Sequence, residues 1–366
     1  MKLAISNCKE YKQEEVFLAV EEAVNNLGGI AKFVQPGQKV LLKPNWLTAA
    51  APEKAVTTHP FVVEAVIRLV QQAGGKVFLG DSPGFGNMEW VLNSCGYGYL
   101  LEKYDLELAD FSTSCYLDNP QGKVIKKIPI ARAVKEADVI INLPKIKTHV
   151  LTVYTGSIKN VFGCVPGLHK GKYHLKYKSR KNFSNFIVDV YTLVKPRLTV
   201  MDGIIGMEGF GPRNGFPKKI GLILACPDGV VLDQYITQYL GLDFRKVPLI
   251  KEALERGLGV KSLSSVEILG DIPVKLDHFL WPYGPKINGG GFIQRRFAGE
   301  PNFIAERCTR CRTCINVCPP KALKLEDGKI KIDRKVCIKC YCCQELCPEN
   351  AVEIKPTKIG RFLRKK

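Results

Sequence analysis

Eight cysteines near the end of the chain repeat one spacing twice, and thiolates at this spacing bind metal clusters. The first copy precedes Pro319 and consists of Cys308, Cys311, Cys314 and Cys318. The second precedes Pro348 and consists of Cys337, Cys340, Cys343 and Cys347. A C-x2-C-x2-C-x3-C-P run wraps around a [4Fe–4S] cluster and gives its fourth thiolate to a second cluster. We therefore expect two [4Fe–4S] clusters with crossed ligand sets, one of Cys308, Cys311, Cys314 and Cys347 and one of Cys337, Cys340, Cys343 and Cys318.

The repeat extends beyond the cysteines, since CPPKALKL after the first copy matches CPENAVEI after the second at an offset of 29 residues. Between them, LKLEDGKIKID predicts two short strands joined at Asp327-Gly328, a dipeptide that favours tight hairpin turns. Residues 301–356 resemble the bacterial two-cluster ferredoxins, which implies low-potential one-electron transfer. Structural zinc is the alternative, but zinc prefers two separated C-x2-C pairs. Cys342 lies outside the repeat and is expected to be a buried bystander.

The remaining cysteines lack pair spacing and are scattered: Cys8, Cys95, Cys115, Cys164 and Cys226. This distribution favours reduced thiols over a disulfide framework, so we expect a cytoplasmic protein. The first residues contain no apolar core of signal-peptide length, and no stretch reaches the 18 apolar residues of a membrane span.

The chain carries a formal net charge of +19, and its basic residues are unevenly spread. Residues 139–188 contain no Asp or Glu, but they include Lys145, Lys147, Lys159, Lys170, Lys172, Lys176, Lys178, Arg180 and Lys181. Such a stretch attracts anions. No helix-turn-helix, zinc-finger or RNA-recognition signature is present, which argues against specific nucleic-acid binding. A basic loop over 167–181 that attracts a small anionic substrate accounts for the charge.

Amphipathic helical patterns alternate with short apolar strands over most of the chain. Helices are expected at 13–29, at 61–73 after a capping threonine hydroxyl at Thr57 or Thr58, near 87–103 and after 229. Strands are expected near 40, 77, 140, 200 and 222, and those near 77, 140 and 200 are each expected to run into a loop. This alternation is typical of a mostly parallel sheet covered by helices on both faces. We therefore predict an α/β domain over 1–270, a Gly- and Pro-rich linker over 271–300, an α+β two-cluster ferredoxin-like domain over 301–356 and a basic tail over 357–366.

Ligands of such sheets bind just beyond the carboxyl ends of the strands. The polar residues expected there are Lys43, Asn45, Asp81, Ser82, Lys145, Lys147, His149 and Asp202. The alternative is that these residues only cap strands that exit into solvent. The glycine run over 206–215, with Gly209 and Gly211, could contact an anion through backbone N–H groups, or could form a flexible lid.

Four segments, LLKPNW, VFLGDSPG, INLPKIKTH and SIKNVFGCVPGLHKGKYH, resemble the family known as domain of unknown function 362 over about residues 38–225. Members of that family are often joined to ferredoxin modules. The resemblance supplies no reaction. It implies that the family's shared motifs include Lys43, Asn45, Asp81, Lys145, Lys147, His149, Lys159 and Asn160.

The first functional hypothesis is an iron–sulfur reductase in which the clusters feed single electrons to an anionic substrate in the basic domain. Lys145 and Lys147 would then hold or polarise the anion, while either Asp81 or Asp202, together with His149, would donate or accept protons. The other expected contacts to the bound molecule are Lys43, Asn45, Lys159, Asn160, Gly209 and Gly211.

Two alternatives remain open: a non-catalytic electron-transfer or scaffold subunit that docks a redox partner, and a nucleic-acid protein with a structural cluster. The fusion of the two domains in one chain favours the reductase hypothesis, because a tethered electron donor acts at a high effective concentration. No flavin or nicotinamide fingerprint is visible, so the electron source is expected to be a redox partner protein or a small donor.

Overall fold

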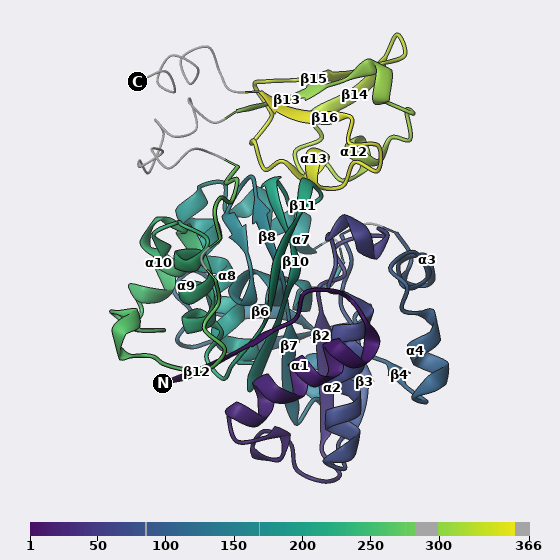
Figure 1. Ribbon diagram of the computed structural model, residues 1–366. Coiled ribbons are helices and arrows are strands. Elements are labelled where there is room, and N and C mark those ends of the chain that lie inside the picture. Colours follow the sequence, from purple (N-terminus) through teal and green to yellow (C-terminus); the bar gives the residue numbers. More distant parts are fainter. Residues whose placement is uncertain (85, 168, 275, 283–298, 356–366) are drawn as a thin grey trace.

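The computed structural model describes residues 1–84, 86–167, 169–274, 276–282 and 299–355 (Figure 1). The predicted basic tail and the greater part of the predicted linker lie outside these residues. The described chain forms a large α/β domain with a smaller domain at one end of its sheet.

The large domain is organised around one ten-stranded sheet. Its strands are β1 (Lys2–Asn7), β2 (Lys39–Pro44), β3 (Lys76–Leu79), β4 (Glu107–Leu108), β7 (Val139–Leu143), β8 (Lys145–His149), β9 (Val153–Thr155), β10 (Leu198–Phe210), β11 (Asn214–Cys226) and β12 (Glu267–Gly270). The order is β12-β1-β11-β10-β7-β2-β3-β4, with β8 paired to β10 and β9. Within the described part of this sheet, only the pairs β1–β11, β10–β11 and β8–β9 are antiparallel, which confirms a mostly parallel sheet.

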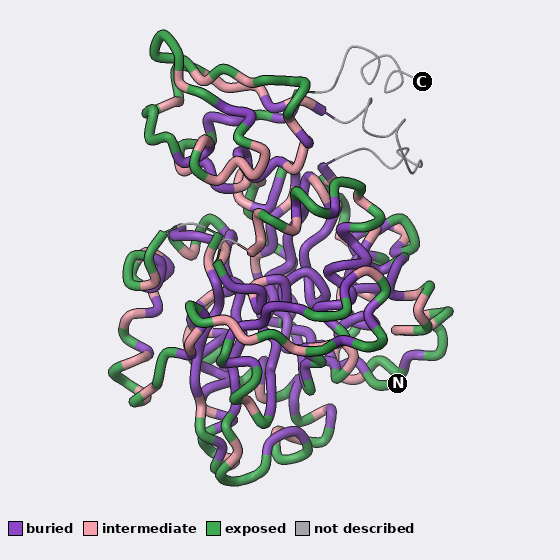
Figure 2. The backbone as a smooth tube through the Cα atoms, turned by 180° about the vertical axis from the view of Figure 1, so that it is seen from behind, coloured by how far each residue is buried: buried purple, intermediate pink, exposed green. Residues whose placement is uncertain are grey.

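Helices cover both faces of the sheet, because successive strand residues point to opposite sides. In β1, Ala4 packs in one core with α1 (Gln13–Asn26) and α2 (Pro60–Gln72). Its neighbours Leu3 and Ile5 pack in the other core with α8 (Arg180–Val194), α9 (Gly229–Tyr239) and α10 (Pro248–Leu254). Figure 2 shows the buried residues running through the middle of this domain. The predicted α/β architecture is confirmed.

Several local expectations need correction. The expected helix at 87–103 is two helices, α3 (Met88–Ser94) and α4 (Gly98–Lys103), because Gly96 between them adopts φ 74°. The chain after β7 is the buried strand β8 and not a loop. The expected loop after β10 is instead a long hairpin of β10 and β11. The group that caps α2 is the His59 ring, whose Nδ1 accepts from Phe61 N at 3.2 Å, and not a threonine hydroxyl.

Other elements surround this framework. They are α5 (Arg132–Glu136), α6 (Ser157–Asn160), α7 (His169–Lys176) and the two-stranded sheet of β5 (Ser114–Asp118) and β6 (Lys127–Ala131). The segment expected as a basic loop at 167–181 therefore contains the helix α7.

The smaller domain has the α+β character expected of a ferredoxin. It consists of β13 (Glu300–Phe303), α12 (Thr313–Asn316), β14 (Leu323–Glu326), β15 (Lys329–Ile332), α13 (Cys342–Glu345) and β16 (Val352–Lys355). The predicted hairpin turn is confirmed, with Asp327 and Gly328 at φ 50° and 70°. The domain rests on the tip of the β10–β11 hairpin (Figure 1), where Gln344 Nε2 donates to Phe210 O at 2.9 Å.

Candidate functional site

The predicted cluster ligands frame two small cavities in the smaller domain. One is lined by Cys308, Cys311, Cys314 and Cys347. The other is lined by Cys318, Cys337, Cys340 and Cys343. These are the two crossed sets expected from the spacing, although the ligand assignment itself remains a prediction.

The chemistry of both donor sets fits an iron–sulfur cluster. Burial raises the pKa of Cys314 to about 11, and the nearby thiols of its own set add to the rise, so these sulfurs face one another. Backbone N–H groups also point at ligand sulfurs, from Ala322 to Cys318 and from Ala351 to Cys347, each at 3.3 Å. Hydrogen bonds of this kind tune cluster potentials. Cys342 is buried and lines the second of these cavities, between the cluster ligands and the large domain.

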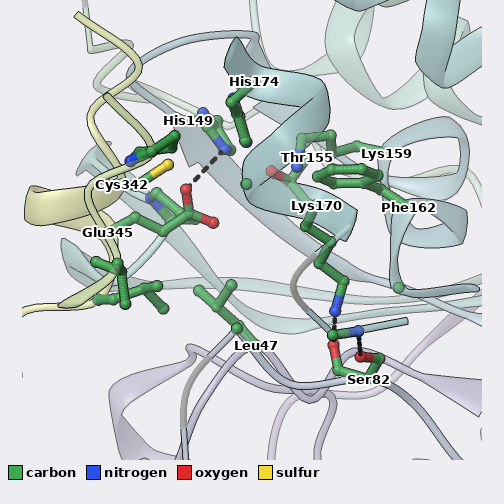
Figure 3. A pocket seen from close by; sticks show the side chains of 18 of the residues that line it. Leu47, Ser82, His149, Thr155, Lys159, Phe162, Lys170, His174, Cys342 and Glu345 are labelled. Atoms are coloured by element: carbon green, nitrogen blue, oxygen red, sulfur yellow. Dashed lines mark hydrogen bonds and ion pairs between the residues drawn. The ribbon is translucent and has the colours of Figure 1, made fainter. Parts of the chain in front are cut away.

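A third cavity, of about 650 Å³, lies between the two domains (Figure 3). Seven residues expected at the site line it: Asn45, Asp81, Ser82, Lys147, His149, Lys159 and Asn160. The smaller domain contributes Asn316, Val317, Cys318, Pro319, Lys321, Cys342, Glu345 and Leu346. The volume is typical of a small-molecule site.

A chain of buried polar side chains supports this cavity from below. Lys147 Nζ donates to Asn45 Oδ1 at 2.7 Å and to Val56 O at 2.6 Å. Asn45 Nδ2 donates to Asn160 Oδ1 at 2.8 Å, and Asn160 in turn bonds Asn142. Burial lowers the pKa of Lys147 to about 7. The ammonium of Lys147 therefore has a strong preference for a nearby anion.

The helix α6 carries Lys159 and Asn160 into the cavity and is fixed by Asp233 of α9. The Asp233 carboxylate accepts from Ser157 N at 2.7 Å and Ile158 N at 2.9 Å, and burial raises its pKa to about 7. Lys159 Nζ lies 4.9 Å from the centre of the Phe162 ring and has no hydrogen-bond partner among the described residues. Burial lowers its pKa. Lys159 is thus a buried cation with free donors facing the cavity.

Asp81 and Lys43 form a buried ion pair at 2.8 Å. Asp81 also accepts from Trp46 N and Ser82 N, each at 2.8 Å, so its carboxylate is fully engaged. A Cβ added at Gly163 would collide with both charged groups, which explains the glycine there. Lys43 does not line the cavity. This pair fixes the floor of the site, and its contacts hold the Asp81 carboxylate in place.

The structure separates Lys145 and Asp202 from the other predicted residues. Lys145 Nζ lies 2.8 Å from Asp202 Oδ2, and both contact the hydroxyl of Tyr11. His59 stacks on Tyr11 with ring centres 3.7 Å apart. Neither Lys145 nor Asp202 lines the cavity between the domains. Their charges compensate each other inside the fold, where an isolated charge would be costly.

The glycine run has a different place from the one expected. Gly209 N donates to Leu280 O at 2.7 Å, and Gly211 N donates to Thr148 Oγ1 at 3.2 Å. Neither N–H is available to an anion, and neither glycine lines the cavity. The run forms the tip of the β10–β11 hairpin that supports the smaller domain, so the expected anion contact and the flexible lid are both corrected.

Comparisons with known proteins agree with this two-domain picture. Residues 40–238 match the family described as Domain of unknown function (DUF362). This chain belongs to the DUF362 family. Residues 300–348 match the 4Fe-4S dicluster domain. This DUF362 protein is therefore an iron–sulfur protein with a ferredoxin domain, the order of domains expected from the sequence.

A curated relative of this DUF362 protein is the thylakoid-associated protein sll1697 from Synechocystis sp.. It is 37% identical over 257 residues, which are 70% of this chain and 79% of the relative. Among the described residues, no helix has the length and apolar character needed to cross a bilayer.

Two solved structures share a limited likeness with the chain. They are the lactate racemase apoprotein from Thermoanaerobacterium thermosaccharolyticum and a protein from Thermotoga maritima. Both have a TM-score of 0.36 and 13% identity; the matches cover 55% and 58% of this chain, and 50% and 54% of those chains. The chain thus spans about half of each, and this likeness is too low to support a shared function.

Several cavity residues of this DUF362 protein were not singled out from the sequence as site residues. Lys170 and His174 come from α7, in the basic stretch expected to be a loop. Phe162 had no distinguishing signal. Glu345 belongs to the cysteine repeat, and only the docking of the ferredoxin domain brings it to the cavity (Figure 3).

Proposed function

We propose that this DUF362 protein is a reductase whose ferredoxin domain supplies electrons to an anionic small molecule bound between the domains. The observation that carries the proposal is the shared wall of the cavity, in which Cys318, a predicted cluster ligand, faces the same space as Lys147 and Lys159. A bound molecule would lie next to one cluster without an intervening protein layer. Tethering replaces collision with a high effective concentration.

Cations outnumber carboxylates in the wall of the cavity. Five lysines line it, Lys147, Lys159, Lys170, Lys172 and Lys321, against the carboxylates of Asp81 and Glu345. Asp81 is already neutralised by Lys43. We therefore assign to Lys159 and Lys170 the binding of the anion. Lys147, with Asn45 and Asn160, is assigned the role of positioning the bound molecule.

Two [4Fe–4S] clusters, when bound, supply electrons one at a time. A two-electron reduction of the substrate takes up two protons, which water in the cavity provides. The electrons come from a low-potential one-electron donor, either a redox protein or a small molecule. A cytoplasmic location is part of the proposal, because the dispersed cysteines suit a reducing compartment.

The test is reoxidation of reduced protein by pools of anionic metabolites, followed by cluster absorbance without oxygen. An active pool should reoxidise wild-type protein, and Lys159→Met should slow the reaction about 10²-fold or more if Lys159 stabilises charge in the transition state. Lys181→Met is the matched control, since Lys181 is exposed and lies outside the cavity wall. If wild type and Lys159→Met react equally with every active pool, the chain is better described as a non-catalytic electron-transfer subunit.

A further inference from the structure

His149 presents one hydrogen-bond donor to the cavity. Its Nδ1 accepts from Leu151 N at 3.0 Å and from Thr152 N at 3.4 Å. The side chain is almost fully buried, and burial holds its pKa well below the ordinary value, with Lys159 as a further cause. The ring is therefore neutral and carries its proton on Nε2. That atom has no hydrogen-bond partner among the described residues.

Across the cavity, the carboxylate of Glu345 places its Oε2 atom 3.8 Å from Nε2. This separation is too long for a hydrogen bond. An unmade hydrogen bond at a buried N–H is costly. This N–H therefore remains available to the acceptor atom of a ligand bound in the cavity.

Other parts of the cavity offer a cation and apolar surface. In Figure 3, Lys170 and Ser82 lie apart from His149 and Glu345, on the other side of the space. Lys170 Nζ donates to Ser82 O. Leu47, Phe162 and Leu346 supply apolar walls. A matching ligand has a hydrogen-bond acceptor at one end, a negatively charged group at the other end and an apolar body between them.

From this arrangement we infer that the cavity binds a conjugated aromatic carboxylate bearing a ketone or aldehyde, with its carbonyl oxygen on His149 Nε2 and its carboxylate at Lys170. The carbonyl is an acceptor that can be reduced, and conjugation delocalises the odd electron that single-electron delivery creates. The step is R–C(=O)–R′ + 2 e⁻ + 2 H⁺ → R–CH(OH)–R′, with the two electrons from the external one-electron donor by way of the clusters and the protons from water. The direction of electron flow rests on the proposed reductase function, but the binding geometry does not.

The test uses two probes that differ only in a carbonyl group replaced by a methylene group, 4-acetylbenzoate and 4-ethylbenzoate. Both are bound to the full chain with oxidised clusters so that no turnover occurs. Isotope-edited infrared spectra of 4-acetylbenzoate, labelled with ¹³C at its carbonyl, report the hydrogen bond directly. The band of the bound probe should lie at lower wavenumber in wild-type protein than in His149→Leu. His149→Gln, which keeps an N–H donor, should retain the low wavenumber.

Affinity gives a second measurement. One hydrogen bond corresponds to about 0.5–1.5 kcal/mol, so wild-type protein should prefer the acetyl probe by roughly twofold to twelvefold, and His149→Leu should lose the preference. Lys170→Met should lower the affinity for both probes by the same factor and leave the carbonyl band of the bound acetyl probe at the same wavenumber. Circular dichroism establishes that each variant is folded.

The inference is overturned if wild type and His149→Leu show the same carbonyl band, if the acetyl probe has no advantage, or if neither probe binds. A failure of the proposed reductase function has a different signature: the band and the preference are present, but no carbonyl compound reoxidises the reduced protein.

Discussion

His149 Nε2 of the DUF362 domain lies 3.8 Å from Glu345 Oε2 of the ferredoxin domain, across the cavity that the two domains enclose. Glu345 is two residues from Cys343, so the position of this carboxylate depends on the same loop that holds the predicted cluster. The cavity is therefore a property of the joined chain, since neither domain alone provides both walls.

Protein purified without oxygen should contain about eight iron and eight sulfide per chain, because each set of four cysteines fits one cluster. Cys347→Ala should damage the cluster of Cys308, Cys311 and Cys314, since these thiols line one cavity. The measurement is iron and sulfide analysis with electron paramagnetic resonance. Stoichiometric zinc, or loss of the other cluster in Cys347→Ala, contradicts the assignment.

Cys342→Ala should leave the iron content unchanged, because the four repeat cysteines of its cavity already provide a complete ligand set. Cys340→Ala is the matched comparison and should remove about half of the iron. Equal losses in the two variants would show that Cys342 is a ligand.

Two buried lysines should behave differently on substitution. Lys145→Met leaves Asp202 as an uncompensated buried charge, so the free energy of unfolding should fall by about 3–5 kcal/mol. Lys159→Met removes a buried cation that has no such partner and should not lower stability. Urea unfolding of both variants, followed by circular dichroism, makes the comparison. A large loss of unfolding free energy in Lys159→Met would show that this lysine has a structural role.

Anion binding in the cavity should weaken as the pH rises. Burial lowers the pKa of Lys170 to about 8, with Asp81 opposing the shift and Lys43 and Lys159 adding to it. Below that pH the ammonium is present, and above it the charge is lost, so the affinity for 4-acetylbenzoate should fall between about pH 7 and 9, by at most about tenfold per pH unit. Calorimetric titration across this range gives the profile.

Lys170→Arg should flatten that profile, because a guanidinium stays charged throughout the range. An unchanged fall in affinity in this variant would move the titrating group to another residue, for which Lys147 is the first candidate, since its pKa is lowered to about 7.

The sequence was sufficient to predict those features of the structure that depend on local residue spacing. The cysteine repeat predicted the two groups that line the small cavities, and helical periodicity predicted α1 and α2. Strand ends predicted the convergence of Asn45, Asp81, Lys147 and His149, because parallel strands end at one edge.

The sequence could not separate Lys145 from Lys147. The two lysines are separated by one residue on β8, so their side chains point to the same face of the strand. Their difference comes from Asp202, which is distant in sequence and neutralises only Lys145. The sequence also could not predict that Glu345 and Lys170 line the same cavity, since this depends on how the two domains dock.

Cys311 is exposed, whereas every other cysteine of the chain is at least partly covered. In air, molecular oxygen should therefore reach the cluster set of Cys308, Cys311, Cys314 and Cys347 first. Damage should begin there while the set beside the cavity is still shielded by the DUF362 domain. A briefly aerated sample should consequently pass through a state with about half of its iron, and its remaining paramagnetic signal should come from the shielded set.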